Sequence, residues 1–346
     1  MTFEAVQLNV VPSAAAAAAA AAPAQVRTGF HCVRGNRRLK VTPRHGDGSR
    51  EIEVNYLWAG APGAPTVIVQ GGISASRDVC DVDGQTANGW WSDLVGPGKA
   101  IDLAAVRVLS IDWLSADELG ASAVSTADQA DVLAALLDAL HIGRVAAFVG
   151  SSYGAMTALA FASRHAHRVE RLVVLAGAHR PHPLSTAQRS IQRNILRLGL
   201  ANGCIAEATS LARQLAMTTY RGASEFAERF AGEATFADGR FQLPVESWLD
   251  HCGKKFATAF DARRYLSLSE SIDLHAVDPA TVNTPTTLIG FASDRLVPLS
   301  DLCELQRGLG AAASLEVVES LYGHDGFLKE SARLAPLLRE ALSMRD

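Results

Sequence analysis

Short apolar runs alternate with longer amphipathic segments along most of this chain. Residues 51–58 alternate between polar and apolar positions as a strand does, and residues 65–69 form a mostly apolar run typical of a strand buried on both faces of a parallel sheet. Similar strand-like runs occupy residues 106–113, 145–149, 172–175, 286–291 and 315–318, and helix-like spacing occupies residues 126–140, 155–165, 302–309 and 326–342. The pattern predicts an α/β protein with a mostly parallel, doubly wound sheet, and Thr126 as the N-cap of the first of these helices.

Residues 179–278 depart from this alternation. They have helix-like spacing, few β-branched residues and many polar positions. We expect an all-helical insertion there, lying as a lid above the carboxyl edge of the sheet. The core is then split between residues 28–178 and 279–346, and the preceding residues 1–27 are expected to form a mobile, alanine-rich tail.

One strand-to-helix junction carries a recognisable chemical pattern. The apolar run 145–149 leads into Gly150-Ser151-Ser152-Tyr153-Gly154, and a helix-like run follows at once. A serine in a G-x-S-x-G turn of this kind is held in a strained backbone with its hydroxyl exposed, so Ser152 is the candidate nucleophile. The alternative is an ordinary glycine-rich turn between a strand and a helix.

Two further residues match the partners that a serine nucleophile needs. Asp294 follows the strand-like run 286–291, and His324 follows the last run, 315–318. Both fall at carboxyl ends of predicted parallel strands, whose side chains reach one crevice, and the chain order Ser, Asp, His is the order this arrangement uses. We therefore expect Ser152, His324 and Asp294 to act as nucleophile, base and orienting carboxylate. The glycines after residues 65–69 lie where a backbone oxyanion donor is expected.

The composition of the chain indicates which classes of binding partner to expect. The 346 residues include 48% hydrophobic and 20% charged residues and carry a formal net charge of −4, with no dense Lys/Arg tract, so a small-molecule partner is expected in preference to nucleic acid. The five scattered cysteines show no C-x-x-C pair and are typical of reduced cytosolic thiols. No histidine pair has zinc-ligand spacing with a carboxylate, so no metal site is expected. No window has the apolar length of a membrane span, and the alanine run 14–22 lacks the charged start of a signal peptide; a cytoplasmic enzyme without membrane contact is expected.

With these residues in view, the chain resembles the homoserine O-acyltransferases of the α/β-hydrolase superfamily, which acylate homoserine for methionine synthesis from acetyl-CoA or succinyl-CoA. The resemblance runs from about residue 51 to residue 328. The motifs that carry it besides the serine turn are Gly89-Trp90-Trp91, Val95-Gly96-Pro97-Gly98-Lys99, Ala178-His179-Arg180-Pro181, Gln188-Arg189, Thr219-Tyr220-Arg221, Arg229-Phe230, Val245-Glu246-Ser247, Lys255-Phe256, Phe260-Asp261-Ala262 and Gly323-His324-Asp325.

The resemblance implies a role for each site residue. Ser152 would take the acyl group from the CoA thioester, so acyl-CoA is a co-substrate and no permanently bound cofactor is implied. Arg189 would hold the carboxylate of L-homoserine and Asp325 its ammonium, since a zwitterion needs one fixed charge of each sign. By position, the backbone N–H groups of Ile73 and Tyr153 would bind the oxyanion. A homodimer formed through the lid is also implied.

Two departures from the family pattern affect the acyl donor. Where the family has His-Ala-Leu-Thr-Gly, this chain has Gln70-Gly71-Gly72-Ile73-Ser74, and Ser151 and Tyr153 replace the usual glycine and methionine beside the nucleophile. Acetyl and succinyl donors both stay open, with Arg77 as one candidate for binding a succinyl carboxylate, against a solvent-facing arginine or one paired with Asp78.

Three alternatives also stay open. They are serine as the acceptor, an esterase or thioesterase that uses water, and a non-catalytic binding protein on the same fold.

Overall fold

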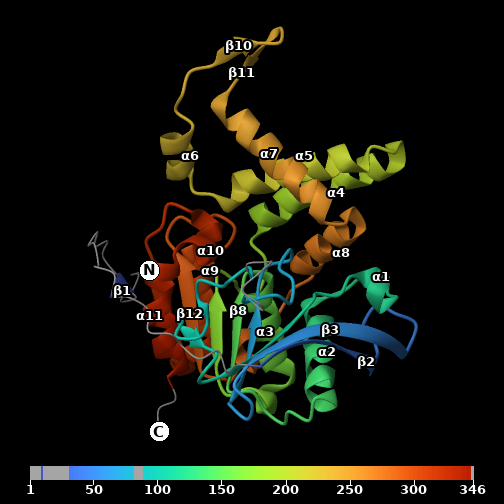
Figure 1. Cartoon of the computed structure of the whole chain (residues 1–346), viewed down its shortest axis with the longest axis vertical. Helices are drawn as coiled ribbons and strands as arrows, with labels where there is room; N and C mark the ends of the chain where they lie inside the picture. Colours follow the sequence, from blue (N-terminus) through green and yellow to red (C-terminus); the bar gives the residue numbers. More distant parts are fainter. Residues whose placement is uncertain (1–8, 11–30, 82–88, 344–346) are drawn as a thin grey trace, which may run out of the picture.

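A nine-stranded sheet forms the centre of the computed structural model, which describes residues 9–10, 31–81 and 89–343 (Figure 1). Its order, within those residues, is β1-β13-β12-β9-β8-β4-β7-β3-β2. The strands are β1 (Asn9–Val10), β2 (His31–Val41), β3 (Arg50–Gly60), β4 (Thr66–Gln70), β7 (Arg107–Ile111), β8 (Ala147–Ser151), β9 (Leu172–Leu175), β12 (Thr286–Phe291) and β13 (Ala313–Val318). A two-residue parallel pair, β5 (Val95–Gly96) and β6 (Ile101–Asp102), lies apart from it.

The parallel direction of most strands places their carboxyl ends at one edge of the sheet. From β7 to β1 all neighbouring strands run parallel, whereas β3 is antiparallel to both β7 and β2. The carboxyl ends of β4, β8, β12 and β13 therefore meet at the same edge, where open parallel sheets bind ligands. The mostly parallel, doubly wound sheet predicted from the sequence is confirmed. Strand β2 was not predicted because most of its positions are exposed, so no apolar run marks it.

Helices cover both faces of the sheet. On one face α2 (Thr126–Ala139), α3 (Tyr153–Arg164) and α9 (Leu299–Leu309) pack on Ile68 and Leu288. On the other face α11 (Ser331–Leu342) packs on Val69 and Ile289. Adjacent strand residues thus face opposite layers, which explains why these strands are apolar at successive positions.

Residues 179–278, which we call the lid, stand above the carboxyl edge of the sheet (Figure 1). The chain enters the lid after β9 and leaves it before β12, and these two strands are paired neighbours. The helices described within it are α4 (Pro183–Asn202), α5 (Ile205–Tyr220), α6 (Ala223–Arg229), α7 (Pro244–Ala259) and α8 (Ala262–Asp273). The core also contains two short α-helices, α1 (Ala116–Leu119) and α10 (Gly326–Lys329), and short 3-10 turns, one of which, Gly323–Asp325, includes His324.

Three local expectations are wrong. The lid is not all-helical, because β10 (Thr235–Ala237) and β11 (Arg240–Gln242) form an antiparallel hairpin. Its turn residues Asp238 and Gly239 both have positive φ, of 52° and 75°, as a two-residue Asp-Gly turn requires. The N-cap of α2 is Ser125, whose hydroxyl accepts the backbone N–H of Asp128, so Thr126 is the first helical residue. The closing helix is divided into α10 and α11 at Glu330.

The expected mobile tail falls mostly outside the described residues. Of residues 1–27 only Asn9 and Val10 are described, and they form β1 against β13. No helix within the described part of the chain has the length and apolar character to cross a bilayer.

Candidate active site

Ser152 lies at the sharp turn between β8 and α3. Its backbone has φ 55° and ψ −115°, a conformation that non-glycine residues rarely adopt. The two flanking glycines permit the turn: a Cβ on Gly154 would lie 2.2 Å from the carbonyl oxygen of Gln70, and one on Gly150 would lie 2.2 Å from the carbonyl oxygen of Gly154. The turn therefore has the strained geometry of a nucleophile elbow, and the alternative of an ordinary turn does not account for it.

The structure brings Ser152, His324 and Asp294 together from three loops at the sheet edge. His324 Nε2 lies 2.8 Å from Ser152 Oγ, and His324 Nδ1 lies 2.8 Å from Asp294 Oδ2. His324 and Asp294 are buried, with relative exposures of 6% and 5%. A base within reach of the hydroxyl, held by a buried carboxylate, is the arrangement that activates a serine.

Backbone hydrogen bonds hold the orienting carboxylate in place. Asp294 follows β12 in a turn, where its Oδ1 accepts the N–H groups of Leu296 at 2.8 Å and Val297 at 3.0 Å. Its other oxygen, Oδ2, is left for the imidazole. Burial alone lowers the pKa of His324, but the charge of Asp294 and its hydrogen bond outweigh that effect, and the pKa of His324 is raised.

The segment after β4 forms the other wall around the nucleophile. A Cβ on Gly72 would lie 3.9 Å from Ser152 Oγ, so its backbone is close to the hydroxyl. Trp113 Nε1 donates to the carbonyl of Gly72 at 2.9 Å and fixes this segment. The backbone N–H groups of Ile73 and Tyr153, the predicted oxyanion donors, donate to no group among the residues described.

The unusual residues beside the nucleophile have different environments. The Tyr153 side chain is fully buried, packs edge-on against Trp113 with ring centroids 4.8 Å apart, and its hydroxyl lies 2.6 Å from Ser271 Oγ in α8. It thus ties the elbow to the base of the lid. Ser151 is also buried, and its hydroxyl has no partner in the described part of the chain.

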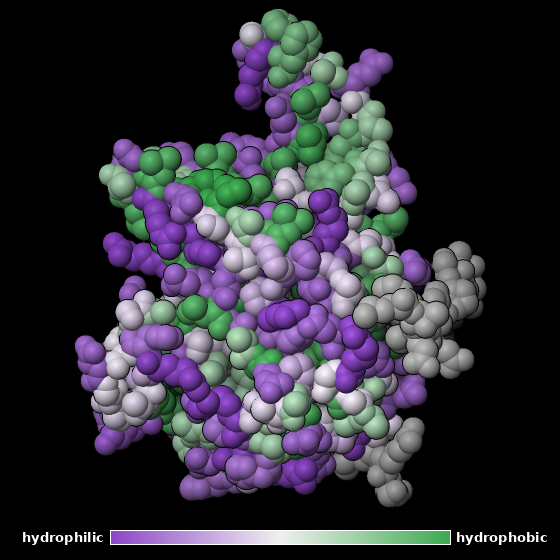
Figure 2. Space-filling model, turned by 180° about the vertical axis from the view of Figure 1, so that it is seen from behind, coloured by the Kyte–Doolittle hydropathy of each residue, from purple (hydrophilic) through white to green (hydrophobic). Residues whose placement is uncertain are grey.

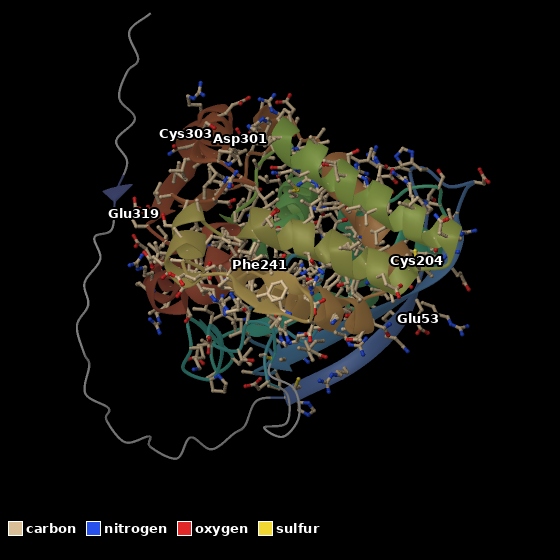
Figure 3. The ribbon with its side chains drawn as sticks, turned by 90° about the horizontal axis from the view of Figure 1, so that it is seen from above. Glu53, Cys204, Phe241, Asp301, Cys303 and Glu319 are labelled. Carbon is tan, nitrogen blue, oxygen red and sulfur yellow. The ribbon has the colours of Figure 1, made fainter. Side chains whose placement is uncertain are left out.

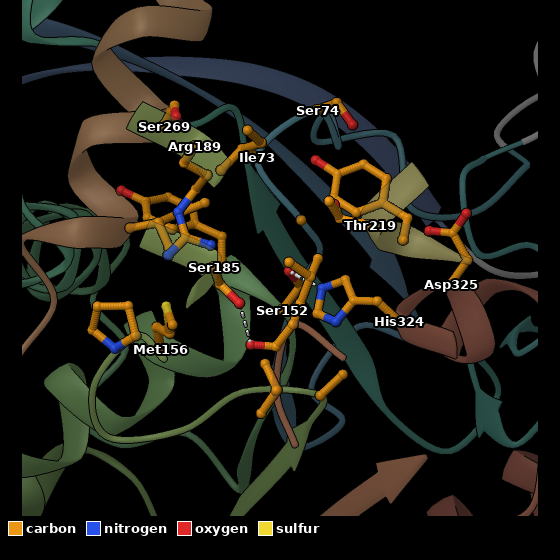
Figure 4. Close-up of a pocket in the computed structure, with 18 of the residues that line it drawn as sticks. Ile73, Ser74, Ser152, Met156, Ser185, Arg189, Thr219, Ser269, His324 and Asp325 are labelled. Carbon is orange, nitrogen blue, oxygen red and sulfur yellow. Dashed lines mark hydrogen bonds between the residues drawn. The ribbon is translucent and has the colours of Figure 1, made fainter. Parts of the chain in front are cut away.

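A cavity of about 1240 Å³, counting its open mouth, lies between the sheet edge and the lid and includes Ser152 and His324 in its lining. Figure 4 shows Ile73, Arg189 and Ser269 on one side of the Ser152–His324 pair, and Thr219 and Asp325 on the other. The cavity therefore has two sides that flank the reacting hydroxyl.

Asp325 follows the candidate base directly and lines this cavity. Its Oδ2 forms an ion pair of 2.8 Å with Arg221 Nε, and burial raises its pKa against the opposing charges of Arg221, His324 and Arg213. Arg221 also pairs with Glu225 at 3.0 Å. Among the residues that the structure describes, the other oxygen of Asp325, Oδ1, has no ion-pair or hydrogen-bond partner.

Arg189, on α4, also lines the cavity, and its guanidinium is held by Asp273. Its Nε and Nη2 contact Asp273 Oδ1 at 2.9 and 2.6 Å, while Arg193 Nη1 contacts Asp273 Oδ2 at 2.5 Å. The three side chains are 9 to 11% exposed. Two guanidinium groups share one carboxylate, so the cluster keeps a net charge of +1 beside the cavity.

A second arginine of the cavity was not singled out from the sequence. Arg213, on α5, lies over the rings of Tyr220 and Phe256, with its Cζ 5.2 and 4.6 Å from their centroids. Within the described residues it has no carboxylate partner. Its contact with Tyr220, seven residues along the same helix, follows from helix spacing, but its contact with Phe256 depends on the meeting of α5 with α7, which helix spacing cannot predict.

Arg77, one candidate for binding a succinyl carboxylate, is not placed in the cavity. It lies outside the lining of the cavity, and its guanidinium contacts Asp112 at 3.0 Å. Asp112 also accepts the backbone N–H of Arg77 at 2.8 Å, so the side chain is held toward β7. Asp78, the partner considered from the sequence, pairs with Arg34 instead.

Known proteins resemble this chain in both sequence and fold. The family model described as alpha/beta hydrolase fold matches residues 65–331. A homoserine O-succinyltransferase from Xanthomonas campestris pv. campestris is 44% identical over 98% of this chain and 91% of its own length, and a homoserine O-acetyltransferase from Thermobifida fusca is 32% identical over 75% and 79%. The chain is a homoserine O-acyltransferase family member. Like the family, it has the α/β-hydrolase fold: the crystal structure of homoserine O-acetyltransferase from Bacillus anthracis has a TM-score of 0.83, at 16% identity, covering 91% of this chain and 98% of that one.

Proposed function

We propose that the protein transfers an acyl group from acyl-CoA to the hydroxyl of L-homoserine through an ester on Ser152. The observation that carries the proposal is the continuous Ser152–His324–Asp294 hydrogen-bond chain at the floor of a cavity that also holds fixed charges of both signs. Membership of the homoserine O-acyltransferase family supports the same substrates, and with them a role in methionine biosynthesis.

The first half-reaction loads the serine. His324 Nε2 takes the proton of Ser152 Oγ as that oxygen attacks the thioester carbonyl. The backbone N–H groups of Ile73 and Tyr153 stabilise the oxyanion. The carbon–sulfur bond then breaks, and the CoA thiolate leaves with the proton from His324.

The second half-reaction uses the same groups in reverse. The homoserine hydroxyl gives its proton to His324 as it attacks the seryl ester, and Ser152 Oγ leaves and recovers that proton. Asp325, next to the base, receives the ammonium of the acceptor. The carboxylate of homoserine is bound by an arginine of the cavity. This is either Arg189, as the family resemblance implies, or Arg213.

The test is release of free CoA in a single turnover, with and without homoserine. A burst equal to the enzyme concentration without acceptor, followed by O-acylhomoserine formation on adding homoserine, is expected. Ser152→Ala is expected to lower turnover by about 10⁴-fold or more. Acyl transfer by that variant at the wild-type rate would contradict the proposal.

The same assay separates the alternatives. Steady release of free acid that homoserine leaves unchanged would identify a hydrolase, and equal transfer to serine would identify a serine acyltransferase. A homodimer formed through the lid is part of the same proposal, from the family resemblance.

A further inference from the structure

The base His324 lies beyond the strand that brings it to the site. Strand β13 ends at Val318, and residues 319–322, which we call the histidine loop, connect it to the 3-10 turn Gly323–Asp325. Asp294 lies instead in the turn that directly follows β12. The 2.8 Å contact between the imidazole and Asp294 therefore depends on how the histidine loop is held against that turn.

The hydroxyl of Ser293 joins these two segments. Ser293 Oγ donates to the carbonyl oxygen of Ser320 in the histidine loop and accepts the backbone N–H of Gly323 at 3.1 Å. Gly323 is the first residue of the 3-10 turn, so its N–H has no acceptor within that turn. Because Ser293 precedes Asp294 and Gly323 precedes His324, one hydroxyl connects the chain neighbours of both members of the pair.

Gly323 also packs tightly against the residues that end α5. It has a positive φ of 58°, and a Cβ there would lie 2.8 Å from the carbonyl oxygen of Tyr220 and 2.9 Å from the backbone nitrogen of Gly222. Only glycine fits such a conformation at such a distance. This packing limits movement of the turn toward α5, whereas the Ser293 hydroxyl provides the directional contacts with the turn of Asp294.

The other side of His324 is held independently of Ser293. Trp91 Nε1 donates to the carbonyl oxygen of Phe327 in α10 at 2.8 Å, and both residues are buried. The Phe327 ring meets the imidazole edge-on, with ring centroids 5.9 Å apart. Loss of the Ser293 hydroxyl should therefore loosen one side of the base and leave the chain folded around it.

We propose, on the basis of the function proposed above, that Ser293 is a positioning residue for acyl transfer, whose hydroxyl keeps the His324 imidazole aligned with Asp294 and Ser152. Ser293 acts through the backbone of residues 320 and 323. Misplacement of a reacting group by about 1 Å can lower a rate by about 100-fold, so one hydroxyl at this junction is sufficient to control the reaction.

The titration of His324 distinguishes positioning from a merely structural role. The charge of Asp294 and its hydrogen bond raise the pKa of His324, and burial lowers it. Asp325 also raises this pKa and Arg189 lowers it, and neither is hydrogen-bonded to Ser293 in the part of the chain that the structure describes. A looser contact with Asp294 should therefore lower the pKa of His324 and move the acid limb of the reaction to lower pH.

The experiment measures the CoA burst in a single turnover over a range of pH, with acetyl-CoA and with succinyl-CoA. Ser293→Ala is expected to keep the burst amplitude and the half-saturating donor concentration within a few-fold. Its burst rate should fall by about 100-fold, and its acid limb should lie at lower pH than that of wild type.

A pair of variants of equal size separates the hydroxyl from its volume. Ser293→Thr keeps the hydroxyl and should retain a burst rate within a few-fold of wild type, whereas Ser293→Val lacks it and should behave as Ser293→Ala does. Ser320→Ala is the comparison within the histidine loop. It removes a hydroxyl that accepts the Tyr322 N–H at 3.0 Å but keeps the carbonyl that Ser293 contacts, so the acid limb should not move.

Wild-type rates and pH profiles in Ser293→Ala and Ser293→Val would overturn the assignment. A slower burst with an unmoved acid limb, a threonine variant as slow as the valine variant, or loss of folding in both the alanine and valine variants would do so too, because Ser293 would then have a structural role. Absence of a burst from either donor in wild type would instead overturn the proposed function.

Discussion

The two carboxylate oxygens of Asp294 have different partners in this site. One carboxylate oxygen accepts two backbone N–H groups of its own turn, and the other accepts from the imidazole of His324. The side chain can therefore rotate only by breaking three hydrogen bonds at once. This holds His324 in the tautomer with a free Nε2 toward Ser152, which is the form that can take the serine proton.

The raised pKa of His324 predicts the pH dependence of acylation. The imidazole must be neutral to accept a proton, so the CoA burst rate should be lost as pH falls through the His324 pKa and should recover above it. Because the Asp294 charge and hydrogen bond raise this pKa, the acid limb should lie above 6.5, the ordinary histidine value. A pH profile of the burst rate measures it.

Asp294→Asn is the companion variant for that profile. It removes the two effects of Asp294 that raise the pKa of His324, while burial, which lowers that pKa, and the smaller raising effect of the Asp325 charge stay, so the limb should move to lower pH. The rate should fall by about 10⁴-fold because the asparagine favours the wrong tautomer. A limb that stays at the same pH in this variant would show that another group controls the titration.

At the scale of elements, the sequence predicts the site better than it predicts the lid. Ser152, Asp294 and His324 each follow an apolar strand, and parallel strands bring their carboxyl ends to one edge, so their meeting could be predicted. The β10–β11 hairpin was missed, although Asp238-Gly239 is a two-residue turn signal, because each of its strands has only three residues, too few to show an alternating pattern. The Arg189–Asp273–Arg193 cluster and Arg213 depend on how lid helices pack together, and helix periodicity does not determine that packing.

The capping of α2 gives a prediction at this scale. Ser125 Oγ accepts the backbone N–H of Asp128, and the Asp128 carboxylate accepts the backbone N–H of Ser125 at 2.8 Å. Ser125→Ala should therefore lower the free energy of unfolding by about 1 kcal/mol, measured by urea denaturation. The sequence-based choice of Thr126 as the N-cap predicts no such loss, so an unchanged midpoint would favour it.

At the scale of the whole molecule, the lid carries exposed apolar side chains. Figure 2 shows hydrophobic residues gathered over the upper part of the molecule, and Figure 3 shows Phe241 on the lid seen from above. Leu198, Phe236 and Phe241 are 66 to 69% exposed. Apolar surface of this kind is suited to burial against another protein, which agrees with the homodimer implied by the family.

The homodimer can be tested at the lid hairpin. Sedimentation should give twice the chain mass, and the double variant Phe236→Ser, Phe241→Ser should weaken association by removing apolar contact area. The control is Val33→Ser. Val33 is an exposed apolar residue on β2, outside the lid, and its replacement should not change the mass. A wild-type protein that sediments as a single chain would contradict the expectation.

The entry and exit of the lid at neighbouring strands β9 and β12 has an evolutionary consequence. The three residues of the acyl-transfer chemistry all belong to the core, whereas Arg189, Arg213 and Asp273 lie in one uninterrupted insertion. A lineage could therefore exchange or remodel that insertion and acquire new substrates without disturbing the reaction centre. Chimeras joined at these two strands would be the natural way to retrace such a history.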